Sequence, residues 1–282
     1  MILIAILVGT IAAGVGSVWL AALLSFGVLA RYTQHMLSLA AGALLATAFM
    51  HLLPEAFESQ ISPQHLFATL LMGLVFFFML DKAELWHHAH EHHDAHQHHH
   101  DHQTLSAGSK NTIESKHHHP SSKDEKGHHH DTPTGGWALL AGDSVHAFGD
   151  GILIASAFMA DLRLGFVAAL AVLVHEVPHH MGDLIVLRQT SNNRRVAFIK
   201  VSLAGAVTAL GGVVGYALVD QLYSYLPFFL VLASSSFIYV ALADLIPQLQ
   251  KRVTTLEATA QIAWLGIGIG LVMLISSLVH RH

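Results

Sequence analysis

Two neighbouring apolar segments of this chain carry side chains that commonly bind metal ions. The first reads His146-Ala-Phe-Gly-Asp150, and the second reads His175-Glu176-Val-Pro-His179. Residues three or four apart share one face of a helix, so each segment would present its ligands together. Imidazole suits Zn and several other transition metals, and carboxylate suits divalent ions more generally. The spacing therefore predicts a metal site where two helices face each other.

The composition places these segments in a membrane. Apolar residues make up 53% of the 282 residues and charged residues only 12%, whereas about a quarter of a soluble protein is charged. Ionisable groups are costly to bury in a bilayer, so by default they indicate a functional site there. Hydrogen bonding between helices is the structural alternative, but five ionisable groups at one depth favour the metal site.

Eight apolar runs come close to or exceed the roughly 20 residues that a spanning helix needs. They cover about Ile2–Ala30, Met36–Phe57, Leu66–Trp86, Trp137–Ala160, Leu164–Leu187, Ala197–Val219, Leu226–Gln248 and Ala260–His280. The first run lacks the basic start of a secretory signal, so we expect it to be retained. The sequence thus predicts an all-α membrane protein with eight transmembrane helices: helices 1–3 in residues 1–86, helices 4–5 in 135–187 and helices 6–8 in 188–282.

A short internal similarity suggests how these helices are arranged. The stretch from Ala48 to Glu55 has His51 three residues before Pro54, and the stretch from Ala241 to Gln248 has Asp244 three residues before Pro247. The two stretches would run in opposite directions, as in the inverted repeats of transporters, where binding occurs near the midplane. We therefore expect a 3+2+3 arrangement, in which helices 4 and 5 are inserted between two related halves.

Residues 87–134, between helices 3 and 4, form a polar tract that holds sixteen of the 25 histidines. Such a composition cannot bury a core and is expected to be disordered. Because imidazole binds Zn, Cu, Ni and Fe, we favour an accessory metal-buffering role over an inert linker.

The basic residues predict the orientation. With eight spans, all of the 14 Lys and Arg residues except Arg163 and Arg281 fall on one side. The positive-inside rule makes that side cytoplasmic, so both termini are expected outside the cytoplasm, in the cell's inner or plasma membrane.

Four further ionisable side chains are expected to line a route for the ion. His51 and Glu55 lie toward the outer end of helix 2, where they could receive an entering cation. Asp143 and Asp183 lie nearer the cytoplasmic ends of helices 4 and 5, where they could receive a leaving one. The ligand set suits Zn2+ and also Cd2+, Fe2+, Mn2+ and Co2+. Binding should weaken at low pH, because ligands must be deprotonated.

The layout and the two helix motifs resemble the ZIP (Zrt/Irt-like) family of divalent metal-ion transporters. The likeness covers nearly the whole chain: eight helices, outside termini, the His-rich loop, His146-x-x-x-Asp150-Gly and His175-Glu176-x-Pro-His179. It implies uptake of zinc into the cytoplasm as a transported substrate, within a homodimer in the lipid bilayer.

The resemblance also implies a division of the ligands into two adjacent metal positions. By the family pattern, His146, Asp150 and His175 form the first, Glu176 bridges, and His179 belongs to the second. The family usually has Asn directly after the helix 4 His, but this chain has Ala147 there. Since Ala cannot bind a metal, the second position is expected to be weakened or absent.

Two other classes of function compete with transport. His175-Glu176-x-x-His179 also fits the zinc-peptidase pattern, in which two His bind zinc and Glu activates water, so the alternative is an intramembrane metalloprotease. Pro178 within that helix turn and the second ligand stripe argue against an enzyme. A metal sensor would need a further cytoplasmic domain. The chain has no cysteine for thiolate ligands, and its formal charge of -5 gives no sign of nucleic-acid binding.

Overall fold

The computed structural model describes residues 1–25, 33–93, 135–190, 194–249 and 254–279, and in these ranges every long element is a helix. The helices are α1 (Ile2–Ile11), α2 (Ser17–Ser25), α3 (Thr33–Thr47), α4 (Leu53–Phe57), α5 (Pro63–His93), α6 (Gly135–Ala160), α7 (Leu162–Thr190), α8 (Arg194–Gln221), α9 (Leu226–Tyr239), α10 (Ile246–Leu249) and α11 (Thr255–Val279). The prediction of an all-α protein is confirmed for these residues.

Three of the long helical rods contain a π-helical turn. Ala12–Gly16 joins α1 to α2, Ala48–Leu52 joins α3 to α4, and Val240–Leu245 joins α9 to α10. A π turn inserts an extra residue into the helix and often occurs at functional sites. The second and third of these turns contain His51 and Asp244, and each is followed by the proline of the internal similarity.

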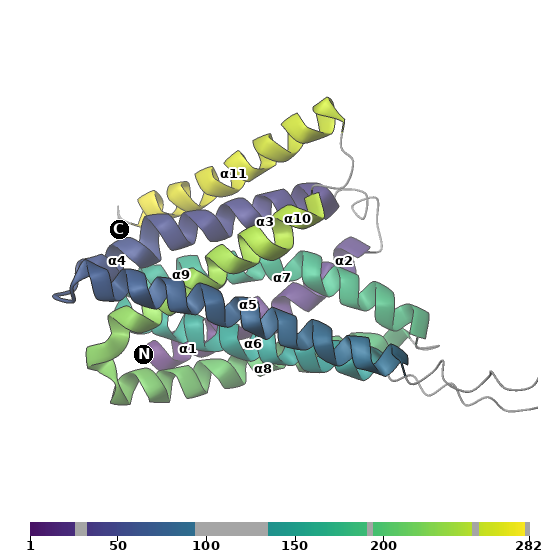
Figure 1. Ribbon diagram of the computed structural model, residues 1–282, viewed down its shortest axis with the longest axis horizontal. Coiled ribbons are helices and arrows are strands. Elements are labelled where there is room, and N and C mark those ends of the chain that lie inside the picture. Colours follow the sequence, from purple (N-terminus) through teal and green to yellow (C-terminus); the bar gives the residue numbers. More distant parts are fainter. Residues whose placement is uncertain (26–32, 94–134, 191–193, 250–253, 280–282) are drawn as a thin grey trace, which may run out of the picture.

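The helices form one bundle of mostly antiparallel rods (Figure 1). Within the described residues, seven helical stretches are long and apolar enough to cross a membrane: Ile2–Leu24, Thr33–Phe57, Pro63–Lys82, Leu162–Leu187, Arg195–Gln221, Tyr223–Leu249 and Thr255–Ser277. The stretches of α5 and α11 lie at the periphery with most of their residues exposed, whereas those of α3, α7 and α9 are mostly buried. Apolar rods with apolar exteriors identify an integral membrane protein.

Helix α6 carries the first predicted ligand segment and lies inside the bundle. It is 26 residues long and packs against α1, α7, α8 and α9. Large side chains such as Ile154 and Phe158 are fully buried there, together with Leu44 of α3 and Phe237 of α9. The core thus encloses α6, whose ionisable residues would be costly to expose to lipid.

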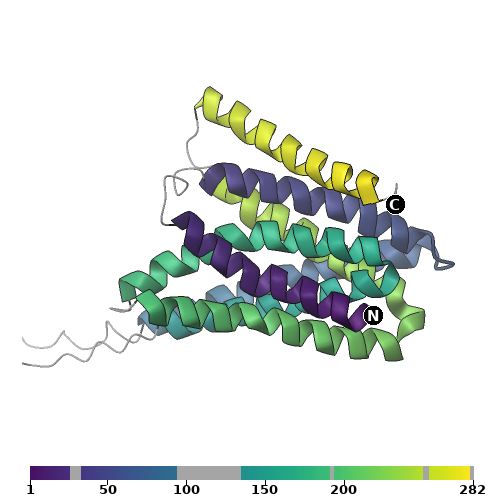
Figure 2. The ribbon, with the colours of Figure 1, turned by 180° about the vertical axis from the view of Figure 1, so that it is seen from behind.

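The chain ends lie toward one end of the bundle. The N-terminus and the last turns of α11 are on the same side as α4, and the last turns of α5 and α7 are on the opposite side (Figures 1 and 2). Helix α5 continues to His93, although the sequence predicts its end near Trp86. The rest of the predicted His-rich loop lies outside the described residues.

Close contact between α6 and α8 depends on glycine. A β-carbon added to Gly151 would collide with the backbone of Thr208, and one added to Gly211 would collide with the backbone of Phe148. Gly151 therefore allows the backbone of α8 to approach α6 closely. A β-carbon on Gly149 would meet nothing within 4 Å, so Gly149 does not contribute to this contact.

This difference between two neighbouring glycines predicts opposite effects of one substitution. Gly151→Ala should destabilise the folded protein by about 1–3 kcal/mol, because the methyl group forces α6 and α8 apart. Gly149→Ala should leave stability unchanged or raise it by up to about 1 kcal/mol, because Ala favours a helix more than Gly does. Thermal unfolding in detergent compares the two variants directly. Equal losses of stability in both would contradict this description of the α6–α8 contact.

Candidate functional site

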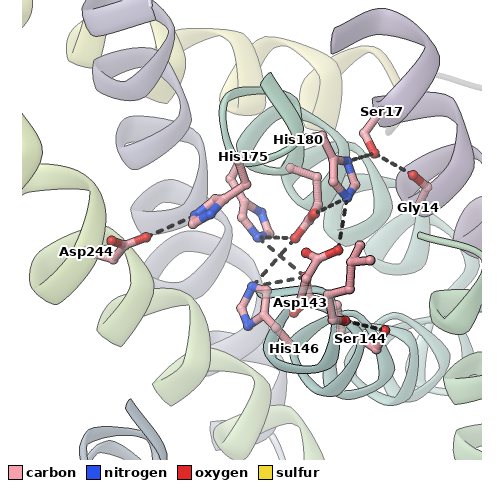
Figure 3. A network of polar contacts seen from close by, with 12 residues as sticks. Gly14, Ser17, Asp143, Ser144, His146, His175, His180 and Asp244 are labelled. Carbon is pink, nitrogen blue, oxygen red and sulfur yellow. Dashed lines mark hydrogen bonds and ion pairs between the residues drawn. The ribbon is translucent and has the colours of Figure 1, made fainter. Parts of the chain in front are cut away.

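Four of the five predicted ligands meet between α6 and α7. His146 and Asp150 come from α6, and His175 and Glu176 come from α7; one ligand atom from each lies within 4.8 Å of all the others. We call these four residues the central cluster. Figure 3 shows the His146 and His175 rings directed toward the same point from their two helices.

The distances within the central cluster suit groups that share a cation. The Nε2 atom of His175 is 3.2 Å from Oε1 of Glu176 and 3.4 Å from Oδ2 of Asp150. The Nε2 atom of His146 is 3.5 Å from Oε1 of Glu176 and 3.8 Å from Oδ2 of Asp150. Three of the four side chains are buried, and that of His146 is 33% exposed, although its Nε2 atom, which faces the cluster, is buried.

A backbone hydrogen bond fixes how His175 presents its ring. Its Nδ1 lies 3.3 Å from the carbonyl oxygen of Ala171, and because a carbonyl only accepts, this nitrogen carries the proton. In the neutral ring, Nε2 then has the lone pair, and it faces Asp150 and Glu176. A hydrogen bond to the second ring nitrogen is the usual way in which a metal-binding His is oriented.

The cluster has the chemistry of a cation site. Among the described residues, Nε2 of His146 and of His175, Oδ2 of Asp150 and Oε1 of Glu176 are buried without a hydrogen-bond partner. Lone pairs and carboxylate oxygens that converge without donors repel one another, and buried charge is costly unless it is compensated. A divalent cation among them would satisfy all four, and imidazole with carboxylate suits Zn2+.

His179 lies beside the central cluster and does not belong to it. Its ring centre is 6.1 Å from those of His146 and His175, but its Nε2 lies 2.9 Å from Oδ2 of Asp244. Asp244 also accepts a hydrogen bond of 2.8 Å from Gln248. In the sequence, Asp244 is recognisable only as the counterpart of His51 in the internal similarity. Its position three residues before a proline is the signal that could have identified it as part of the site.

Of the four predicted pathway residues, one lies in a group of potential metal ligands within the described part of the chain and three do not. Asp143 forms a second group of potential ligands with Glu176 and His180. His51, within its π turn, and Asp183, on α7, are both partly buried, and Glu55 is exposed. Among the described residues, the last three belong to neither group.

A pocket of about 210 Å³ lies next to His179, at the end of the bundle where α3 begins and α10 ends. It is lined by Thr33, Leu37, Pro178, His179, Met181, Gly182, Ile185 and Gln248. His179 is adjacent to the rings of His146 and His175, but none of the four residues of the central cluster lines this pocket.

A comparison with protein-family models identifies the chain. The model described as "ZIP Zinc transporter" matches residues 1–276, which is nearly the entire length. This chain belongs to the ZIP family. The resemblance inferred from the helix motifs is therefore confirmed, and with it the assignment to metal-ion transport.

Several curated ZIP proteins are similar to it. "Zinc transporter ZIP13" of Danio rerio is 28% identical over 272 residues, which cover 86% of this chain and 76% of the relative. "Zinc transporter ZIP4" of Homo sapiens is 28% identical over 262 residues, 80% of this chain and 40% of the relative. "Zinc transporter foi" of Drosophila melanogaster is 31% identical over 141 residues, half of this chain and 20% of the relative. The last two relatives extend far beyond the matched part.

ZIP membership and the geometry both disfavour the peptidase. In the peptidase pattern, His175 and His179 would bind one zinc ion and leave Glu176 to activate water. In this structure His179 is paired with Asp244, whereas Glu176 lies between the rings of His146 and His175. His175 and His179 therefore contact different carboxylates and do not converge on one ion. The metalloprotease alternative is not supported.

Proposed function

We propose that this ZIP protein carries Zn2+ across the membrane into the cytoplasm by way of the central cluster. The observation that supports this proposal is the convergence of His146, Asp150, His175 and Glu176 in the interior of an apolar bundle. His146 and His175 lie near the middle of helices of 26 and 29 residues. At about 1.5 Å per residue, the cluster is then near the bilayer midplane.

The arrangement we propose for the membrane has eight spans in a 3+2+3 inverted repeat. Helix α6 adds an eighth span to the seven found by length and composition. Two observations support the repeat. First, π turns occur in matching positions before Pro54 and Pro247. Second, Thr33, at the start of α3, lines the same pocket as Gln248, in α10. Helices α6 and α7 are the inserted pair, and the movement of one repeat against the other would expose the cluster alternately.

We propose that the end of the bundle where α5 and α7 finish faces the cytoplasm. Lys82, Arg195 and Lys200 lie toward this end, and Arg163 lies in the first turn of α7, toward the other end. Basic residues favour the cytoplasmic side. Both termini are then outside the cytoplasm, in the inner or plasma membrane of the cell.

The route proposed for the ion follows from this orientation. Glu55 and His51 lie on the outer side of the cluster, where they would receive a hydrated cation. On the inner side, Asp143 and Asp183 are one to two turns from the cluster along α6 and α7, and the pocket beside His179 lies at the same end. We propose that these groups pass the ion to the cytoplasm, where the His-rich tract of residues 87–134 buffers it.

The range of ions and the assembly are further parts of the proposal. Imidazole and carboxylate ligands without thiolate also suit Cd2+, Fe2+, Mn2+ and Co2+. The homodimer rests on the family resemblance.

The proposal is tested by zinc uptake into proteoliposomes that contain a zinc-sensitive dye. Uptake should saturate as external Zn2+ rises, because a site with a finite number of ligands limits the rate. A large excess of Mg2+ should not compete, because Mg2+ favours oxygen ligands and keeps its water. Liposomes without protein are the control. Uptake that matches these liposomes and increases linearly with Zn2+ would overturn the proposal.

A further inference from the structure

Beside the central cluster lies a second set of buried ligand side chains. One atom each from Asp143 of α6 and from Glu176 and His180 of α7 lies within 4.8 Å of the others. The Nε2 atom of His180 is 3.3 Å from Oε2 of Glu176 and 3.9 Å from Oδ2 of Asp143. The His180 side chain is 0% exposed and that of Asp143 is 10% exposed. Figure 3 shows His180 and Asp143 directed toward each other.

Ser17 of α2 determines which nitrogen of His180 faces the carboxylates. Its hydroxyl donates to the carbonyl oxygen of Gly14 at 2.6 Å, and its oxygen lies 2.9 Å from Nδ1 of His180. A hydroxyl has one proton, which goes to Gly14, so Ser17 must accept from His180. The Nδ1 atom of His180 is therefore protonated, and in the neutral ring Nε2 carries the lone pair.

This arrangement requires a positive charge between His180 and the carboxylates. The Nε2 atom of His180 is fully buried and has no hydrogen-bond partner among the described residues. A lone pair that faces two carboxylate oxygens is repelled by both, and the low dielectric of a protein interior strengthens that repulsion. A metal cation would turn the three groups into ligands. A proton on Nε2 is the competing occupant, and the experiment below separates the two.

Glu176 belongs to both sets through different oxygens. Its Oε1 faces His146 and His175, whereas its Oε2 faces His180. A carboxylate that uses one oxygen for each of two cations holds them close together, and paired metal sites are about 3.5–4 Å apart. The second set is also about one turn closer to the end where α6 begins and α7 finishes.

We propose that a second divalent cation binds between Asp143, Glu176 and His180, next to the ion in the central cluster. This inference rests on the proposed function and deepens it. The expectation that Ala147 leaves the second position weak or absent does not consider these residues, which provide ligands without any contribution from position 147. An ion that leaves the central cluster then has a prepared position on the cytoplasmic side, and Ser17 is the positioning residue for its imidazole ligand.

The test is anomalous X-ray diffraction from crystals of the full chain grown with Cd2+. Two peaks are expected in the interior of the wild-type protein, one in the central cluster and one between Asp143, Glu176 and His180. In His180→Ala the second peak should disappear while the central peak remains. A wild-type crystal with only the central peak would overturn the second position and leave the proposed function intact. An unoccupied central cluster would instead contradict the proposed function.

Substitution of Ser17 tests the positioning role separately. Ser17→Ala should lower the Cd2+ affinity of the second position by about 10–100-fold, as is usual when a partner of a ligand is lost, with the central peak unchanged. Ser144→Ala is the matched control, since Ser144 also lies near the site but donates only to the carbonyl of Leu140 in its own helix. Unchanged occupancy in Ser17→Ala, or an equal loss in Ser144→Ala, would overturn the role of Ser17.

Discussion

Replacement of both His146 and His175 by Ala should reduce zinc uptake to the level of protein-free liposomes. These residues supply both imidazoles of the central cluster, and without them only two carboxylates remain to replace the water of the ion. Loss of a residue that merely supports a ligand costs about 10–100-fold in affinity, so loss of two ligands should reduce uptake by at least about 100-fold. Dye-loaded proteoliposomes provide the measurement.

The control for this double variant is His65→Ala. His65 is exposed at the start of α5 and bonds only to Ser62 and to its own helix among the described residues, so its uptake should equal that of the wild type. Size-exclusion chromatography and circular dichroism show whether the double variant is folded. A folded double variant with wild-type uptake would remove the central cluster from the transport route.

The sequence was sufficient to predict how the side chains of α6 are arranged at the candidate site. His146 and Asp150 are four residues apart and Asp143 lies three before His146, so a regular helix must place all three near one face. Helix α6 contains no π turn or proline in its described part, and nothing distorts that periodicity. The three side chains therefore lie on the face of α6 that the spacing predicts.

The α7 half was less predictable, because its residues face more than one neighbour. His175 and His179 share a face by spacing, but His179 is paired with Asp244 from the π turn between α9 and α10. The position of that turn depends on packing and cannot be inferred from periodicity. His180, the next residue along the helix, contacts Ser17 of α2 and Glu176 instead. Sequence spacing predicts which residues share a face of a helix, but it does not predict which residues of other helices contact that face.

The same limit applies to the glycines of α6. Gly149 and Gly151 are equally small, and no sequence pattern distinguishes them. Only the position of α8 makes Gly151 the point of close approach and leaves space beside Gly149. Prediction of helix contacts therefore required the tertiary structure, whereas prediction of the ligand stripe required only the helical repeat.

Glu176→Gln should be the most damaging single substitution, because it affects both sets of ligands at once. Gln has the shape of Glu but no charge, and its amide nitrogen is a donor that cannot bind a cation. Zinc uptake should fall by at least about 100-fold, as in the double His variant. By contrast, His180→Ala removes a ligand from the second set only and leaves the central cluster complete.

Thermal stability distinguishes loss of binding from loss of folding in Glu176→Gln. A ligand at 100 times its dissociation constant stabilises the folded state by about 2.7 kcal/mol, so saturating Zn2+ should raise the Tm of the wild type. It should not raise the Tm of Glu176→Gln. Without metal, the variant should be at least as stable as the wild type, since it no longer buries a carboxylate whose Oε1 lacks a hydrogen-bond partner among the described residues.

Glu257→Gln is the matched control. Glu257 is an exposed carboxylate in the first turn of α11 that accepts hydrogen bonds from the backbone and hydroxyl of Thr254, far in sequence from both ligand helices. Its zinc-dependent rise in Tm should equal that of the wild type. If Zn2+ stabilises Glu176→Gln as much as it stabilises Glu257→Gln, the shared carboxylate is not a ligand, and the ion must be held by His146, Asp150 and His175 alone.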